Sequence, residues 1–254
     1  MLTYGSILRR ALTVGAVAGI ALAAYTFLVI EPTIDDAIAL EEAMSAAEHP
    51  AHGGHDHGDD PMFSRPEQVR GGLAAMVIYT LVAAGIFGTV FAAVRHRLPG
   101  RDDLGRAIWL AAMGFGALAL MPAIKYPANP PAVGDPGTVG ERTTLYLVLL
   151  VVSLLLMWGL THLRRRLEGR LDSGTRVVVM TLATIVAFGT VLVVMPGTPD
   201  AIDPAVPADL VWQFRIRSLG GMALLWTALG VGIGWLVAHD AARAEQTAPT
   251  SSAA

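Results

Sequence analysis

Six long stretches of the chain contain no Asp, Glu, Lys or Arg, and apolar residues dominate each of them. They cover residues 11–30, 71–94, 107–124, 143–163, 177–199 and 218–238. At about 1.5 Å of rise per residue, even a helix of about 18 residues reaches about 27 Å, close to the ~30 Å hydrocarbon core of a bilayer. Because unpaired backbone groups are costly in lipid, each stretch should be helical. The pattern predicts an all-α integral membrane protein, a bundle of six transmembrane helices.

The first stretch is expected to remain as a membrane-spanning helix. Arg9 and Arg10 precede it, as basic residues also precede a signal peptide. Its 20 residues exceed the usual apolar core of a signal peptide, and no small-x-small cleavage site precedes Glu31. We therefore predict a single transmembrane domain over residues 1–254 that includes this helix.

The polar segments between the stretches carry their own pattern. Residues 31–70 are expected to form an acidic, histidine-rich loop, within which residues 33–48 predict a short helix that either extends the first helix or lies along the surface. Ile34, Ile38 and Met44 share one side of that helix, so its acidic residues face water. After the last stretch, residues 239–254 are expected to form a disordered tail.

The first, third and fifth stretches each end with a proline, in Glu31-Pro32, Met121-Pro122 and Met195-Pro196. The last two junctions continue alike, with a Pro-rich loop, an arginine and then the next stretch. This similarity favours three repeated helix hairpins in one orientation, as in some transporters. The alternative is that proline simply terminates helices at membrane interfaces. Both interpretations stay open on the sequence.

Small residues recur at helix-packing spacing in two stretches. Gly15 and Gly19 form one pair, and Gly230 and Gly234 form another. Such pairs let helix backbones approach closely in lipid, which supports a helix bundle. Because glycine is abundant in this chain, the pairs indicate no particular interface.

Composition agrees with a membrane protein and removes several functions. The chain is 54% hydrophobic and 15% charged, whereas soluble domains are about 25% charged. The absence of cysteine excludes disulfides, thiolate metal sites and cysteine nucleophiles. A net charge of −3 gives no basic footprint for nucleic acid. The chain contains no phosphate-binding G-x-x-x-x-G-K-[ST], H-E-x-x-H or G-x-S-x-G motif, so we expect no enzyme.

The basic residues predict the orientation. With a cytoplasmic N-terminus, the inner segments 1–10, 95–106, 164–176 and 239–254 hold 12 of the 18 basic residues. By the positive-inside rule, both termini are then cytoplasmic. Fifteen of the 21 acidic residues fall outside, which makes the outer face anionic and attractive to cations.

A histidine cluster lies between the first and second stretches. Four of the seven histidines fall within nine residues, and three aspartates lie among or just after them. The full set is His49, His52, His55, His57, Asp56, Asp59 and Asp60. Neutral imidazole is the commonest metal-binding side chain, and carboxylates add oxygen ligands. We interpret this segment as a metal-capture loop on the outer face. The alternative is a hydrophilic loop that is rich in histidine by drift.

Within the six stretches the sequence offers few ligands. No charged residue lies there, so no proton relay or buried ion pair is expected. Most methionines in the stretches should serve packing, although Met121 and Met195 repeat their position before a proline. Glu31, at the end of the first stretch, is the one further carboxylate expected to meet a metal ion; a plain helix-end charge is the alternative.

The order of these features resembles the CbtA family of cobalt transporter subunits from prokaryotes. The matching features are Arg9-Arg10 before the first helix, Glu31-Pro32, the acidic helix, His49 to His57, Met121-Pro122 with its Pro-rich loop, and Met195-Pro196 with the loop to Arg217. The resemblance spans nearly the whole chain. It implies cobalt uptake for cobalamin synthesis, beside a small one-helix partner, CbtB, that has histidines of its own.

These observations together predict an inner-membrane transporter subunit for a divalent transition metal. The resemblance favours cobalt as the cargo, whereas the residues alone suit nickel or zinc at least as well. We expect no prosthetic group and no nucleic acid partner. The expected partners are the lipid bilayer and a small CbtB-like membrane subunit. The alternative is a metal-binding accessory or sensor protein that does not itself transport, which the lack of ligands inside the stretches favours.

Overall fold

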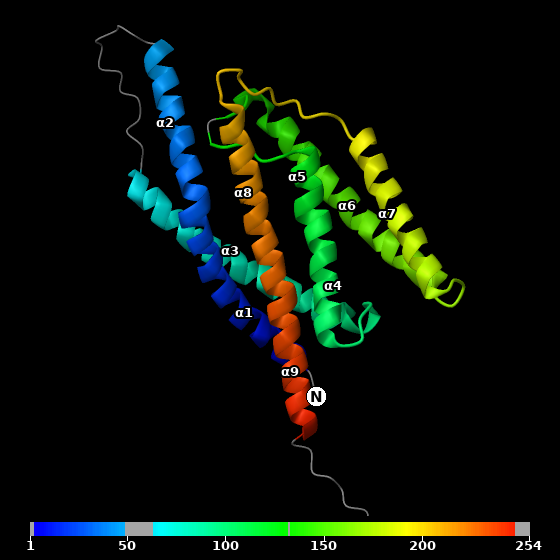
Figure 1. Ribbon diagram of the computed structural model, residues 1–254. Coiled ribbons are helices and arrows are strands. Elements are labelled where there is room, and N and C mark those ends of the chain that lie inside the picture. Colours follow the sequence, from blue (N-terminus) through cyan, green and yellow to red (C-terminus); the bar gives the residue numbers. More distant parts are fainter. Residues whose placement is uncertain (1–2, 49–62, 132, 247–254) are drawn as a thin grey trace, which may run out of the picture.

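The computed structural model describes residues 3–48, 63–131 and 133–246. Across these ranges the backbone forms helices and loops without a named strand. Six helical units are long and apolar enough to cross a membrane: Tyr4–Ala46, Arg65–Arg97, Asp103–Lys125, Pro136–Leu167, Ser173–Val194 and Ala208–Asp240. The predicted six-helix membrane fold is therefore confirmed. Figure 1 shows the units Arg65–Arg97 and Pro136–Leu167 lying obliquely to the steeper unit Ala208–Asp240.

The first unit is one continuous helix that passes through a proline. It consists of α1 (Tyr4–Tyr25), the π-helical turn η1 (Thr26–Ile30) and α2 (Glu31–Glu48). Proline lacks an N–H and its ring clashes with the carbonyl four residues earlier, so an undistorted helix cannot contain Pro32. The widened turn before it absorbs this conflict, because Glu31 N–H donates to the carbonyl of Thr26, five residues back.

The third unit uses the same device. It consists of α4 (Asp103–Phe115), the π-helical turn η3 (Gly116–Leu120) and α5 (Met121–Lys125). Met121 N–H donates to the carbonyl of Gly116, again five residues back and directly before a proline. At the first junction the helix continues past the proline as α2, so residues 33–48 extend the first helix. At the second junction α5 ends at Lys125, one residue beyond the predicted stretch 107–124.

At the third junction the helix does end. α7 (Ser173–Val194) stops before Met195, which adopts an extended backbone with ψ of 139°. A residue that precedes proline is disfavoured in the helical region, so Met195 leaves the helix. Only the first two junctions share the π-helical turn, so the three junctions differ in this detail. The repeat of three hairpins stays a prediction.

The remaining units are long helices with short extensions. α3 (Arg65–Val94) continues into η2 (Arg95–Arg97), and η4 (Pro136–Thr138) leads into α6 (Val139–Leu167). The last unit comprises α8 (Ala208–Thr227), the π-helical η5 (Ala228–Ile233) and α9 (Gly234–Gln246). α9 therefore extends into residues 239–246, which the sequence led us to expect as part of a disordered tail.

Both glycine pairs lie where two helices touch. A Cβ atom on Gly15 would sit 2.6 Å from the Cβ of Ala84, so α1 and α3 are in backbone contact. A Cβ atom on Gly230 would sit 2.6 Å from the Cβ of Ala111, which places η5 against α4 in the same way. These close approaches confirm that the glycine spacing serves helix packing. They also identify the interfaces, which the sequence left open.

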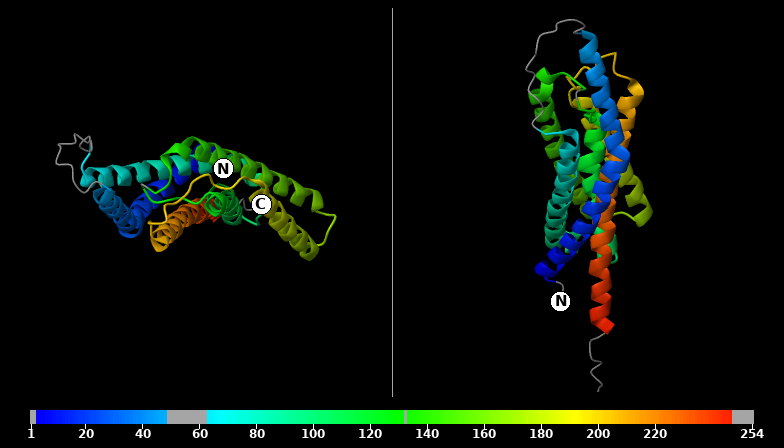
Figure 2. Two further views of the ribbon diagram at one scale, coloured as in Figure 1. Left: turned by 90° about the horizontal axis from the view of Figure 1, so that it is seen from above. Right: turned by 90° about the vertical axis from the view of Figure 1, so that its left-hand side faces the viewer.

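The helices form two rows. Seen from above in Figure 2, α3 and α6 lie along one side of the molecule, while α8, α4 and α7 lie along the other. Phe87 and Phe91 of α3 stack on each other, and Phe87 meets the edge of Trp226 from α8. These aromatic side chains belong to the buried core that joins the two rows. α7 stands at the margin and contributes no buried residue.

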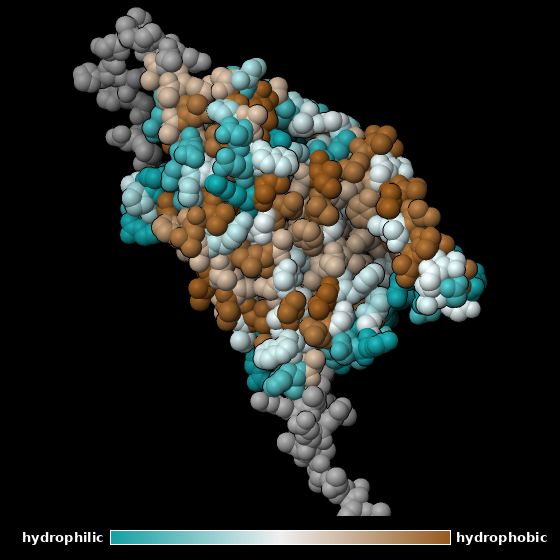
Figure 3. Space-filling view, viewed as in Figure 1, coloured by the Kyte–Doolittle hydropathy of each residue, from teal (hydrophilic) through white to brown (hydrophobic). Residues whose placement is uncertain are grey.

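On the face shown in Figure 3, an apolar belt lies between two polar ends. Exposed Val, Leu, Ile and Trp side chains make up this belt, as expected of a lipid-facing surface. We call one end the α2 end, formed by α2 and the loops 126–135 and 195–207. We call the other the basic end, which carries the arginines of residues 95–106 and 164–170.

Candidate functional site

Seven of the eight predicted metal ligands lie outside the described residues. These are His49, His52, His55, His57, Asp56, Asp59 and Asp60. The structure does describe both ends of the segment that carries them. α2 ends at Glu48, directly before the first histidine, and α3 begins at Arg65. Both ends of the segment therefore lie at the α2 end of the molecule.

The eighth predicted ligand, Glu31, lies at the base of α2 and is paired with an arginine. Its side chain is 12% exposed and accepts a hydrogen bond from Nη2 of Arg65, on the neighbouring helix α3. The same Nη2 atom lies 2.7 Å from Oδ1 of Asp35, and Nε of Arg65 lies 3.0 Å from it. Glu31 and Asp35 are four residues apart on one helix, so both carboxylates face one position. The guanidinium of Arg65 fills that position.

The base of α2 is also tied to α8. Arg217 donates from Nη1 to the hydroxyl of Thr33, whose side chain is buried. The hydroxyl of Tyr25 in turn donates to the carbonyl of Arg217 over 3.0 Å. Arg65 and Arg217 thus hold the base of α2 from two sides. This arrangement fixes the direction in which α2 leaves the apolar belt.

A second carboxylate at this end, Asp200, was not singled out in the sequence. Its side chain is 3% exposed and accepts from Nη1 of Arg142 over 2.6 Å. It also accepts from Nδ2 of Asn129 over 2.7 Å and from the backbone N–H of Asp135 over 2.8 Å. These three donors occupy most of the acceptor sites of the carboxylate and already include a cationic group, so its arrangement is that of a structural residue. Asp200 therefore joins the loops 126–135 and 195–207 to the start of α6.

The loops make further contacts that support this structural role. Arg215 of α8 donates from Nη2 to Oδ1 of Asn129 over 2.7 Å. The hydroxyl of Tyr126 donates to the carbonyl of Pro196 over 2.9 Å. Burial raises the pKa of Tyr126, so its phenol remains a donor throughout the physiological pH range. The only sequence signal for this network was the recurrence of an arginine after each Pro-rich loop.

A cavity of about 460 Å³ lies between α2 and the two loops. Three carboxylate residues line it, together with Met44, and they are Glu41, Asp135 and Asp203. Asp135 and Asp203 each accept a backbone N–H of their own turn, from Gly137 and Ala205. Over the described ranges, no group of three or more His, Asp or Glu side chains is arranged to hold a metal ion. The cavity can therefore attract a hydrated cation, but these residues do not form a coordination site.

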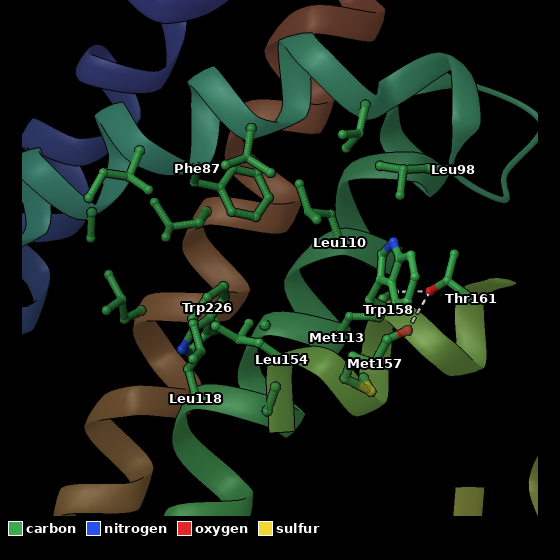
Figure 4. Close-up of a pocket in the computed structure, with 18 of the residues that line it drawn as sticks. Phe87, Leu98, Leu110, Met113, Leu118, Leu154, Met157, Trp158, Thr161 and Trp226 are labelled. Carbon is green, nitrogen blue, oxygen red and sulfur yellow. Dashed lines mark hydrogen bonds between the residues drawn. The ribbon is translucent and has the colours of Figure 1, made fainter. Parts of the chain in front are cut away.

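A larger cavity, of about 670 Å³, lies inside the apolar belt (Figure 4). It lies between α3 and α6, against α4 and α8, and its walls are mostly apolar. The hydroxyl of Thr161 points to the sulfur of Met113 over 3.8 Å and donates to the carbonyl of Met157 over 2.8 Å. Met121, one of the two methionines before a proline, is buried elsewhere in the packing.

The histidines near the basic end pack at its surface. His162 stacks on Trp158 and accepts from Nε of Arg166 over 3.0 Å. His239 stacks on Trp235 in α9. Such stacking of a histidine on a tryptophan is typical of residues at a membrane–water interface.

Comparisons with known proteins place this structure in a family. Neither the curated proteins nor the solved structures gave a match to the chain. The model of one protein family, described as "Probable cobalt transporter subunit (CbtA)", matches residues 4–238. This range contains all six membrane-spanning helices and nearly the whole chain. The chain is therefore a multi-pass membrane protein that belongs to the CbtA family of cobalt transporter subunits.

Proposed function

We propose that this chain is the membrane-spanning subunit of a cobalt uptake system that supplies cobalamin synthesis. The observation that carries the proposal is the family match over nearly the whole chain. The charge distribution supports an arrangement in the inner membrane with the α2 end outside and both termini in the cytoplasm.

Capture begins at the histidine segment in this proposal. His49, His52, His55 and His57 supply imidazole ligands, while Asp56, Asp59 and Asp60 add oxygen ligands and negative charge. The carboxylates around the 460 Å³ cavity raise the local concentration of cations beside α2. Nickel and zinc compete for such a site, because cobalt binds more weakly than nickel in the common affinity order.

Glu31 and Asp35 form the next position for the cation. Both carboxylates already converge on one cationic group, the guanidinium of Arg65. A divalent ion that reaches this position must displace Arg65, which begins α3 just after the histidine segment. Exchange between arginine and metal ion would thus couple metal arrival to a movement of the chain at the mouth. A metal ion held only by two carboxylates is bound weakly enough to move on.

The route through the bilayer needs a further component. The spans contain no charged residue, and the large cavity between them is apolar. A small histidine-containing membrane subunit, similar to CbtB, or a second copy of the chain would complete the path. The membrane potential can drive the ion inward, since it is worth about 2.3 kcal/mol per charge per 100 mV.

The test is uptake of radioactive cobalt in cells that lack other cobalt importers, with and without the chain and a co-expressed partner. Replacing the four clustered histidines with alanine should raise the half-saturating cobalt concentration about tenfold or more while the maximal rate is largely retained. Glu31→Gln should lower the maximal rate, because it removes half of the two-carboxylate position. Glu141→Gln, an exposed carboxamide substitution at the same end, serves as the matched control. Uptake that never exceeds the background of empty cells would contradict the proposal.

A second candidate is a metal-binding accessory or sensor protein that does not transport. The observation that favours it is the absence of a metal-ligand group in the part of the chain that the structure describes. Such a protein would still bind cobalt, and loss of the four histidines would abolish its response entirely. Binding without uptake, in the presence of the partner, would select this function over transport.

A further inference from the structure

The large cavity between α3 and α6 opens onto the lipid-facing surface. Trp158, Ile86 and Val82 line it, and their side chains are 70%, 61% and 57% exposed. Phe87, Leu110 and Trp226 form its deeper wall, as Figure 4 shows. A volume of about 670 Å³ falls in the range of about 300–1,000 Å³ that is typical of sites that enclose a ligand. In a bilayer, the molecule that reaches such an opening sideways is a lipid.

Cationic groups gather where this cavity meets the basic end. Arg97 of η2 and Arg165 of α6 both line it, although they belong to different helical units. Nη2 of Arg165 donates to the backbone carbonyl of Arg97 over 2.8 Å, which holds the two residues together. Among the described residues, neither guanidinium has a carboxylate partner, whereas Arg10, Arg95 and Arg106 at the same end each have one.

We infer that this cavity binds an anionic phospholipid. Its acyl chain lies in the apolar slot between α3 and α6, and its phosphate lies against Arg97 and Arg165 at the basic end. Guanidinium groups bind phosphate through paired, charge-assisted hydrogen bonds, and basic pockets between transmembrane helices favour anionic lipid headgroups.

The charges decide between a lipid and the other occupants of such a slot. A cobalt ion is repelled by two guanidinium groups and finds no charged ligand among the apolar walls. A transmembrane helix is about 10 Å wide with its side chains and would satisfy the apolar walls, but it brings no anion to Arg97 and Arg165. Only a ligand with an apolar tail and an anionic head matches both parts of the site.

The test is native mass spectrometry of the full chain, with phosphatidylglycerol or phosphatidylcholine of identical acyl chains added to the detergent. The wild-type chain should retain phosphatidylglycerol at least tenfold better than phosphatidylcholine. Arg97→Gln together with Arg165→Gln should remove this preference. The matched control is the double variant Arg101→Gln with Arg170→Gln, which removes the same charge from the same end but outside the cavity. This control should retain the preference for phosphatidylglycerol.

A second variant tests the slot separately. Ala83→Leu places a larger side chain on the cavity wall in α3 and should reduce retention of both lipids severalfold. Added inorganic phosphate should not displace the lipid, which separates a lipid site from a phosphate site. The inference would be overturned if the wild-type chain retained both lipids equally. It would also be overturned if the control variant lost the preference for phosphatidylglycerol as fully as the Arg97 and Arg165 variant. A co-purified protein helix that is lost in Ala83→Leu would overturn it in favour of a partner subunit.

Discussion

Asp200 and Glu31 are both carboxylates near the membrane surface at the α2 end, yet their surroundings differ. Asp200 accepts three hydrogen bonds, two from the loop 126–135 and one from α6, and is almost inaccessible. Glu31 shares a single arginine with Asp35. The hydrogen bonds of Asp200 hold the loops in place, whereas the guanidinium of Arg65 beside Glu31 is a partner that a cation can replace.

Substituting Asp200 with asparagine should destabilise the protein. Asparagine keeps the size of the side chain, but it loses the ion pair with Arg142. Its amide NH2 group, itself a donor, would also face one of the donors that Asp200 now accepts from. The expected loss is about 1–3 kcal/mol, as for other buried groups that lose a partner. A lowered Tm in detergent would report it. Asp209→Asn changes an exposed aspartate nearby and should leave the Tm unchanged.

The coupling within this cluster can be measured in the same assay. Arg142→Gln should also lower the Tm, and the double variant with Asp200→Asn should lose less than the two single losses together. Strict additivity would mean that the 2.6 Å contact contributes nothing to stability.

For single residues, the sequence predicted where a side chain lies better than which side chain it pairs with. Glu31 was expected at the mouth because it follows an apolar stretch, and it does lie at the base of α2. Its pairing with Arg65 could not be predicted, because a contact across more than 30 residues depends on how α2 and α3 meet. Asp200 was missed because, in the sequence, nothing distinguishes it from other loop acids until Asn129 and Arg142 are brought beside it.

At the scale of elements, close helix contacts depend on single glycines. A Cβ atom on Gly88 of α3 would lie 2.5 Å from the Cβ of Ala11, whereas one on Gly159 of α6 would meet nothing within 4 Å. Without other changes, alanine in place of glycine stabilises a helix by about 1 kcal/mol. The two positions therefore separate packing from helix propensity.

We expect Gly88→Ala and Gly159→Ala to have opposite effects. Gly88→Ala should lower the Tm, because α1 and α3 must move apart to admit the methyl group. Gly159→Ala should leave the Tm unchanged or raise it slightly. Thermal unfolding of both variants in one detergent gives the comparison, and a stabilised Gly88→Ala would show that the α1–α3 contact is looser than the structure has it.

The number and order of the elements followed from the gaps between charges, but their ends did not. The fifth stretch was expected to reach residue 199, and its helix ends at Val194 because Pro196 disfavours a helical Met195. The sixth stretch lies inside a longer helical unit that begins at Ala208 and ends at Gln246. Hydropathy marks the part of a helix that contacts lipid, while capping and proline decide where the helix begins and ends. The π-helical turns gave no signal beyond the prolines that follow two of them.

For the molecule as a whole, the orientation in the membrane stays a prediction, and labelling of introduced cysteines can test it. It contains no cysteine, so any introduced cysteine is the only thiol. In right-side-out membrane vesicles, a membrane-impermeant maleimide should label Ser45→Cys on α2 and spare Arg101→Cys in the loop before α4. Inside-out vesicles should give the reverse pattern. If Arg101→Cys reacts in right-side-out vesicles instead, the α2 end faces the cytoplasm and uptake becomes export.

The unbroken helix from Tyr4 to Glu48 also determines the electrical environment of the histidine segment. α2 has 18 residues, so at about 1.5 Å per residue its far end stands up to about 27 Å beyond Glu31. The Debye length at physiological ionic strength is only about 8 Å. The segment that follows Glu48 therefore starts up to about three screening lengths beyond the level of Glu31. The charge of the bilayer is largely screened at that distance, so capture should depend on the protein's own carboxylates and be insensitive to the surface charge of the bilayer.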